Sequence, residues 1–503
     1  MSLGKGATLS ALKLVNTGLG FVLGLALAWV LPTDGYMDAL NTAMFIAVNL
    51  ARELPRVVGM VLIPFLVESA LAKRERVPQL FMTWWLVVLA AATLLLFAVA
   101  PWIPRIVTPK LPETALVEGG HLLRILAPSF FLLGLFGIGQ SIFYSRRVFY
   151  EPELAATVWR VAAMGALFVA GGLFGVRGYA VGLVGAAVAQ LAVLLHASRR
   201  HRIPVLAISA PFEGLGDLAP LKAGAATIGV FLLLDQANPF VDRFITSFLP
   251  EGSISILGFG DRLAKALPVL MATSFISVFI PELSATRVTE GSMRRVGSAM
   301  ATFLMSVGLP LAVLVIWAAH DLVALILLHG KFTASQAPIA AGTVIAYAVG
   351  VPASLTGMGI KGMYFVERNT REVARFGILA LVINTLSDLL LLPLGVKGIA
   401  LASSVTVWIV TIYLWKRADL GWPHWRPAAR ILGGAACMVG LLFALPWADW
   451  LTRVALRLPV AGVTALSVYL VLVYPYWKRL DVGGVTDASR NVGPPGIAAT
   501  EGT

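Results

Sequence analysis

Three basic residues of this chain, Arg52, Arg262 and Lys265, lie inside long apolar stretches, where a charged side chain is costly. An ionisable group in such a place usually faces a cavity, a partner or a ligand. Because a guanidinium fork matches two phosphate oxygens at once, the two arginines favour an anionic, phosphate-containing ligand. The alternative is structural ion pairing, for which the neighbouring carboxylates Glu53 and Asp261 are the candidates.

A second group of polar residues carries only oxygen and amide atoms. Asn384 and Asp388 are four residues apart in one apolar stretch, so a helix places them on the same face. Asp242 and Ser404, from two other stretches, could join them in an oxygen-only site for Na⁺ or a proton. The alternative interpretation is a network of hydrogen bonds between helices.

No motif of covalent catalysis accompanies these residues. The sequence has no Gly-Lys-Ser/Thr phosphate loop, no G-x-S-x-G motif and no histidine pair with metal-ligand spacing. Cys437 is the single cysteine, which excludes a disulfide framework. The sequence therefore indicates neither an enzyme nor a bound cofactor, apart from Na⁺ or H⁺ as a coupling ion.

Apolar stretches of about 20 residues, long enough to cross a bilayer as helices, must position these side chains. In a chain of 503 residues with 58% hydrophobic and 13% charged residues, they predict an all-α, polytopic membrane protein. About fourteen spans are predicted, at residues 9–31, 37–66, 78–102, 119–143, 154–175, 178–196, 220–248, 256–283, 295–318, 335–363, 372–392, 396–415, 428–446 and 456–477.

The net charge of +13 comes largely from lysines and arginines in every second gap between spans. This distribution is typical of cytoplasmic loops beside anionic lipid and argues against nucleic acid as a partner. It predicts that both termini are cytoplasmic. The first apolar stretch follows Lys5 and Lys13 and is interpreted as a retained helix rather than a cleaved signal peptide.

A weak internal repeat suggests two halves. Arg52-Glu-Leu-Pro55 resembles Lys265-Ala-Leu-Pro268, six spans later. Coincidence is one explanation, and two six-helix lobes facing a central cavity are the other. The predicted parts are a lobe at 1–200, a lobe at 215–417, two extra helices at 426–480 and a disordered tail at 481–503.

Several segments together resemble the MurJ (MviN) lipid II flippases. The strongest is Gly252-Ser-Ile-Ser-Ile-Leu-Gly-Phe-Gly-Asp-Arg262-Leu. The others are Asp38-Ala39, Asn49-Leu-Ala-Arg52, Gly330-Lys-Phe-Thr333, Tyr364-Phe-Val-Glu-Arg-Asn-Thr370 and the segment from Asn384 to Asp388, followed by Gly398-Ile-Ala-Leu-Ala402. This resemblance covers nearly the whole chain.

The resemblance implies the fold of the multidrug/oligosaccharidyl-lipid/polysaccharide exporter superfamily, with a cationic cavity between two lobes and a lipid-tail groove in the last two helices. The cavity arginines of the family correspond to Arg52 and Arg262, and with Lys265, Glu53 and Asp38 they make the expected headgroup site. The sodium ligands of some relatives correspond to Asp242, Asn384, Asp388 and Ser404.

One departure from the family concerns the first span. Members usually carry an Arg-Asp pair after Leu-Gly-Phe, whereas here Leu23 and Gly24 occupy those positions. Because a cavity arginine and its carboxylate are missing, the resemblance leaves the chemical identity of the cargo's headgroup undecided.

Together these features lead to the hypothesis of a flippase in a bacterial inner membrane. It would move an undecaprenyl-pyrophosphate-linked saccharide, lipid II first among the candidates, by alternating access. Another exopolysaccharide or O-antigen unit is the alternative cargo. A drug/cation antiporter should favour acidic residues, and a polytopic glycosyltransferase should carry catalytic residues in a large loop. Membrane lipids and cell-wall or polysaccharide synthesis proteins are the expected partners.

Overall fold

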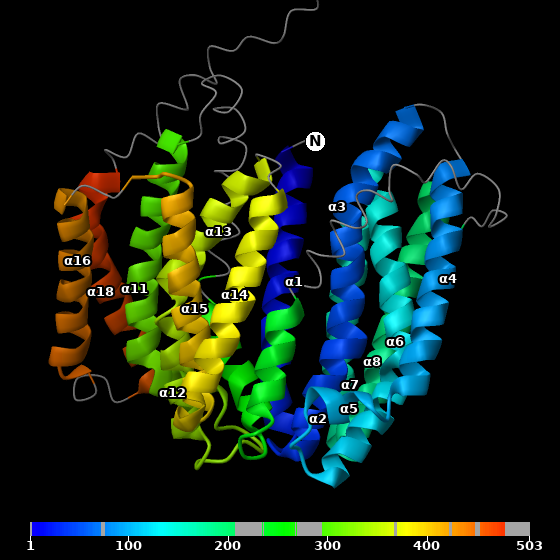
Figure 1. Cartoon of the computed structure of the whole chain (residues 1–503), viewed down its shortest axis with the longest axis horizontal. Coiled ribbons are helices and arrows are strands. Elements are labelled where there is room, and N and C mark those ends of the chain that lie inside the picture. The colour runs from blue at the N-terminus through cyan, green and yellow to red at the C-terminus, as the bar shows by residue number, and fades with distance from the viewer. Residues whose placement is uncertain are drawn as a thin grey trace, which may run out of the picture. The chain divides into compact units, whose positions relative to one another are not determined.

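The computed structural model describes residues 3–71, 76–206, 234, 236–266, 268, 294–366, 370–421, 425–447 and 453–477. Within these ranges the regular structure is helical and no strand occurs, which confirms the all-α prediction (Figure 1). The predicted disordered tail at 481–503 and much of the predicted spans at 220–248 and 256–283 lie outside the described residues.

The first half of the chain is a series of long helices joined by short connections. In order they are α1 (Leu3–Val30), α2 (Gly35–Met44), the π-helical turn η1 (Phe45–Asn49), α3 (Leu50–Leu71), α4 (Arg76–Val99), α5 (Ile103–Val107), α6 (Glu113–Ser145), α7 (Tyr150–Ala166), the π-helical turn η2 (Leu167–Gly171) and α8 (Gly172–His201). Residues 236–246 and 253–266 are also helical.

The second half continues the same pattern. Its helices are α11 (Arg294–Ile326), α12 (Ala337–Ala348), α13 (Val351–Val366), α14 (Thr370–Leu391), the 3₁₀ turn η4 (Leu392–Leu394), α15 (Val396–Arg417), α16 (Trp425–Ala444) and α18 (Val454–Trp477). Each predicted span is mostly helical where its residues are described, with turns or irregular residues at some span ends and at 349–350.

The helices have the length and composition of membrane spans. Among the described residues, eight helices are long and apolar enough to cross a bilayer, or nine if the bent pair α12 and α13 counts as one span. Large apolar side chains such as Leu94, Leu173 and Leu390 are exposed at 70 to 78% of their surface, as expected of residues that face lipid. The chain is a multi-pass membrane protein, and the figure of fourteen spans stays a prediction.

The helices group into two compact units. Unit 1 comprises residues 1–263, 322–343 and 377–402, and unit 2 comprises 264–321, 344–376 and 403–503. In unit 1, α6 packs against α2, α3, α4 and α8, and α7 packs against α1 and α8 (Figure 1). The division into lobes at 1–200 and 215–417 stays a prediction.

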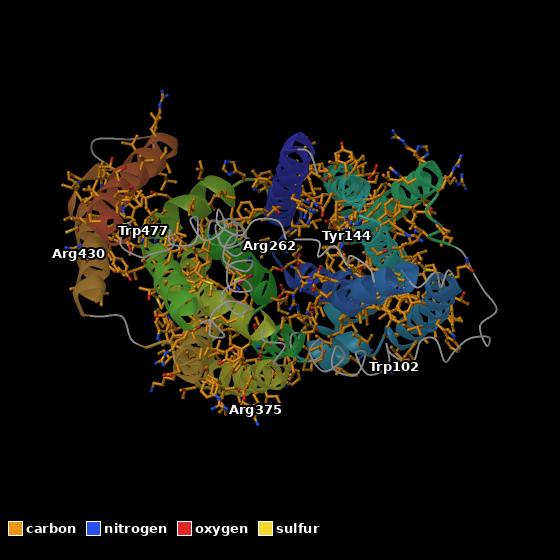
Figure 2. All side chains as sticks on the ribbon, turned by 90° about the horizontal axis from the view of Figure 1, so that it is seen from above. Trp102, Tyr144, Arg262, Arg375, Arg430 and Trp477 are labelled. Carbon is orange, nitrogen blue, oxygen red and sulfur yellow. The ribbon has the colours of Figure 1, made fainter. Side chains whose placement is uncertain are left out.

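In unit 2, α16 and α18 form an antiparallel pair that packs on α11. Its buried centre includes Met438, Leu442 and Tyr469. The Tyr469 hydroxyl donates to the carbonyl of Ser306 in α11, and the Trp477 indole donates to the Ser306 hydroxyl at 2.8 Å. Figure 2 labels Arg430 and Trp477 on this helix pair.

Candidate functional site

Arg52 lies on α3, just after the π-helical turn η1, and its side chain is partly buried. Its guanidinium carbon is 3.5 Å from the centre of the Trp159 ring on α7, a cation–π stack. Among the described residues, no hydrogen bond or ion pair reaches this guanidinium. Its five N–H groups are therefore available to a ligand or to water.

Arg160, the next residue of α7, belongs to a polar network that reaches α1. Its guanidinium donates to the Asn16 side-chain oxygen, and the Asn16 amide donates to Glu153 at 3.4 Å. The other Glu153 oxygen accepts from the Tyr144 hydroxyl at 2.8 Å (Tyr144 is labelled in Figure 2). Sequence reasoning left Arg160 out, although it lies in the apolar span at 154–175 and so meets the criterion that selected Arg52.

Arg262, labelled in Figure 2, lies on the helix at 253–266, and its side chain packs on the backbone of α1. One guanidinium nitrogen donates to the carbonyl of Gly24 at 2.7 Å. A Cβ atom added at Gly24 would lie 2.8 Å from the Arg262 Nε, which is closer than real Cβ contacts allow. The glycine found in place of the family's aspartate is therefore the surface on which Arg262 rests.

Asp38, predicted in the headgroup site, caps the helix that carries Arg262. It is 1% exposed, and its carboxylate accepts hydrogen bonds from the Gly252 amide (2.8 Å), the Ser255 amide (2.8 Å) and the Ser255 hydroxyl (2.6 Å). Gly252 has a φ of 83°, and a Cβ there would lie 2.7 Å from the Thr33 carbonyl oxygen, so glycine is required. The contacts make Asp38 a positioning residue for Arg262.

Glu53 forms an ion pair with Arg56, one turn along the same helix, at 2.5 Å. Its charge also acts on Arg52, its neighbour in sequence. The ion pair of Glu53 on α3 is thus with Arg56, whereas the sequence had suggested Glu53 as the partner of Arg52.

Tyr179 of α8 brings a buried hydroxyl to the same part of unit 1. Its side chain is completely buried, and it lies close enough to Arg52 and Arg262 to interact electrostatically with both. Within the described part of the chain its hydroxyl has no hydrogen-bond partner, and neither has the indole N–H of Trp159. Buried polar groups rarely stay unpaired, so two donors here are without the partner that such groups require.

Lys265, the third predicted cation, belongs to unit 2. Its ammonium lies 5.4 Å from the centre of the Tyr347 ring. Both residues line a cavity of about 80 Å³, together with Pro268, Ser354 and Ser404. The cavity thus brings together Lys265 and Ser404, which the sequence analysis had placed in different sites.

Ser404 donates its hydroxyl to the carbonyl of Ala346 at 2.6 Å, at the end of α12. The next residues on the same face of α15 do likewise: the Trp408 indole donates to the Val349 carbonyl (2.9 Å), and the Thr411 hydroxyl donates to the Ala353 carbonyl (2.9 Å). α12 and α13 meet at a bend of 42°, where carbonyls lose their helical partners. At this bend the Gly350 amide donates to the Tyr347 carbonyl and not to Ala346, so Ser404 supplies the donor that the Ala346 carbonyl lacks.

The remaining residues of the predicted cation site do meet in unit 1. The Asn384 amide nitrogen donates to Asp242 at 2.6 Å and to Asp388 at 2.9 Å. Asp388 is completely buried, and one of its oxygens has no hydrogen-bond donor among the described residues. The contacts are those of a hydrogen-bond network, but two carboxylates on one amide also leave negative charge for a proton or a cation to balance.

The chain is similar to known proteins over most of its length. The family model described as "Lipid II flippase MurJ" matches residues 36–446. Proteins named probable lipid II flippase MurJ are 27% identical over 191 residues in Rickettsia prowazekii (37% of each chain) and 28% identical over 267 residues in Vibrio cholerae (49% of this chain, 50% of that one). A Treponema pallidum protein of the same name is 22% identical over 448 residues, which is 83% of this chain and 82% of that one.

The first two of these matches span only about a third to a half of the relatives' lengths. Among solved structures, one titled "Lipid II flippase MurJ, inward closed conformation" has a TM-score of 0.80 at 19% identity and covers 94% of this chain and 99% of that one. A MATE transporter in the bent conformation has a TM-score of 0.59 at 13% identity, with 86% and 96% covered. These two likenesses concern the fold.

Proposed function

We propose that this chain, which belongs to the lipid II flippase MurJ family, carries a polyprenyl-pyrophosphate-linked saccharide across the bacterial inner membrane. Lipid II is the first candidate for the cargo, and another lipid-linked saccharide is the alternative. Transport proceeds by alternating access, without covalent chemistry, and both termini lie on the cytoplasmic side.

The observation that supports this proposal most is the arginine chemistry of unit 1. Arg52 and Arg262 belong to helices of a membrane protein, and the guanidinium of Arg52 has no hydrogen-bond acceptor within the described residues. A polyprenyl tail can stay in lipid, but its charged headgroup must cross about 30 Å of hydrocarbon. Guanidinium groups can replace the water that a pyrophosphate loses on the way.

The membrane potential can supply the energy for this transport. Moving an anion outward runs with an inside-negative membrane potential, which contributes about 2.3 kcal/mol per charge per 100 mV. The cluster of Asp242, Asn384 and Asp388 is our candidate for a coupling site for Na⁺ or H⁺. A drug/cation antiporter is less consistent with the residues, because the arginines of unit 1 would repel a cationic drug.

The test is a leaflet-accessibility assay for lipid II in cells depleted of their own flippase. Wild-type protein should restore translocation, whereas Arg52→Ala and Arg262→Ala should abolish it at equal expression. Arg105→Ala is the matched control, because Arg105 is exposed and pairs with the exposed Glu113. Loss of transport in the control, or full transport by both Arg52→Ala and Arg262→Ala, would overturn the proposal.

A further inference from the structure

Two neighbouring turns of α1 are covered by arginines from two other helices. Gly20 and Gly24 are four residues apart, so they share one face of α1 and lie about 6 Å apart along its axis. A Cβ at Gly20 would lie 2.7 Å from the Arg160 Nε, and one at Gly24 would lie 2.8 Å from the Arg262 Nε. The absence of side chains at both glycines lets two guanidinium groups approach the same stripe of backbone.

Arg160 is held in place without being neutralised by a direct ion pair. Its one hydrogen-bond acceptor among the described residues is Asn16, and no carboxylate there lies within ion-pair distance of it. Asn16 also links Arg160 to Glu153, whose oxygens accept from Asn16 and Tyr144. The guanidinium is therefore oriented by the network while most of its N–H groups stay available.

Arg52 of α3 is the third arginine of the group. It stacks on Trp159, the residue before Arg160, and the charges of Arg52 and Arg160 repel one another. Two like charges inside a helix bundle are unfavourable, and an anion bound between them would relieve the repulsion. The unpaired Tyr179 hydroxyl, within electrostatic reach of Arg52 and Arg262, is a further donor for such an anion.

We propose that Arg160 is a third headgroup-binding residue, which with Arg52 and Arg262 holds the pyrophosphate of the cargo against the glycine face of α1. The inference rests on the proposed function and adds a residue to its site. A pyrophosphate fits because it offers several acceptor oxygens and more than one negative charge to three guanidinium groups and two unpaired donors. A monophosphate would leave part of this set unused.

The experiment measures binding of geranylgeranyl pyrophosphate to the purified full chain in detergent by titration calorimetry. Geranylgeranyl monophosphate and inorganic pyrophosphate serve as comparison ligands for the headgroup and the lipid tail. Arg160→Ala and Arg160→Gln should weaken pyrophosphate-lipid binding about tenfold to a hundredfold, as expected on loss of charge-assisted hydrogen bonds. They should also reduce the preference for pyrophosphate over monophosphate, which a merely structural defect would not change.

Glycine variants test the same geometry without removing a charge. Gly20→Ala should weaken pyrophosphate binding because its methyl group displaces Arg160. Gly18→Ala is the matched control on the same helix, since a Cβ at Gly18 meets nothing within 4 Å. It should bind as wild type does, and melting temperatures should confirm that every variant is folded.

The role of Arg160 would be overturned if Arg160→Ala and Gly20→Ala kept wild-type affinity and selectivity while Arg52→Ala lost binding. The proposed function would then still stand. Equal binding of inorganic pyrophosphate and the lipid by wild type would also overturn the role of Arg160, because the site would then recognise a free anion. No binding of the pyrophosphate lipid by wild type would overturn both proposals.

Discussion

Replacing Asp38 by alanine should destabilise the protein more than the loss of an ordinary helix cap. The carboxylate is 1% exposed and accepts three hydrogen bonds from Gly252 and Ser255 at 2.6 to 2.8 Å. A hydrogen bond to a charged group contributes about 1.5 to 3 kcal/mol net, and relief of the buried charge offsets part of the loss. We expect Asp38→Ala to lower the free energy of unfolding by about 3 to 5 kcal/mol.

Asp34 provides the internal comparison. It is the N-cap of α2, where its side chain accepts one hydrogen bond, from the Met37 amide at 3.0 Å. Loss of a single cap costs about 1 kcal/mol, so Asp34→Ala should melt well above Asp38→Ala. Because Asp38 holds the helix of Arg262, Asp38→Ala should also weaken pyrophosphate-lipid binding, whereas Asp34→Ala should not. Equal melting temperatures in the same detergent would refute this reasoning.

Two further predictions concern other charged clusters. If Asp388 ligates Na⁺, sodium should raise the melting temperature of wild type relative to a larger cation, and Asp388→Asn should reduce that rise; no sodium-specific rise in wild type would contradict it. Glu372, outside the apolar span that starts at Ala374, accepts hydrogen bonds from Arg417 (3.2 Å) and Arg375 (2.6 Å), which lower its pKa below the ordinary 4.5. Its stabilising charge is then present above pH 4.5 and is lost as the pH falls through the lowered pKa. Glu372→Gln should therefore melt below wild type at pH 7, and this difference in melting temperature should disappear in acid. A difference that does not change with pH would count against this.

The helices could be predicted because bilayer thickness imposes a length on every span, and that length is visible as a run of apolar residues. The interruptions could not be predicted. The π-helical turn at Phe45–Asn49, just before Arg52, contains neither glycine nor proline. Such turns depend on the packing of the neighbouring helices, which a single span does not encode.

Residues of the candidate site could be predicted where the free-energy cost of a charge in an apolar span is enough to single them out. Arg52 and Arg262 stand out because charge is expensive in an apolar span, and the same argument applies to Arg160. The part played by Asp38 was not predictable, because its partners lie 214 and 217 residues away and no local pattern signals that contact. The meaning of Gly24 likewise depends on Arg262, 238 residues further on.

The bend between α12 and α13 has a consequence for how unit 2 can change shape. Ser404 donates to the Ala346 carbonyl, which the Gly350 amide leaves when it donates to Tyr347 at the bend, so the bent form gives up few hydrogen bonds. In a straight helix the Ala346 carbonyl would accept from the Gly350 amide, and the Ser404 hydroxyl would be released to water or cargo. Bent and straight forms would then make nearly the same number of hydrogen bonds. A ligand that binds one form slightly more tightly could therefore shift the equilibrium between the two.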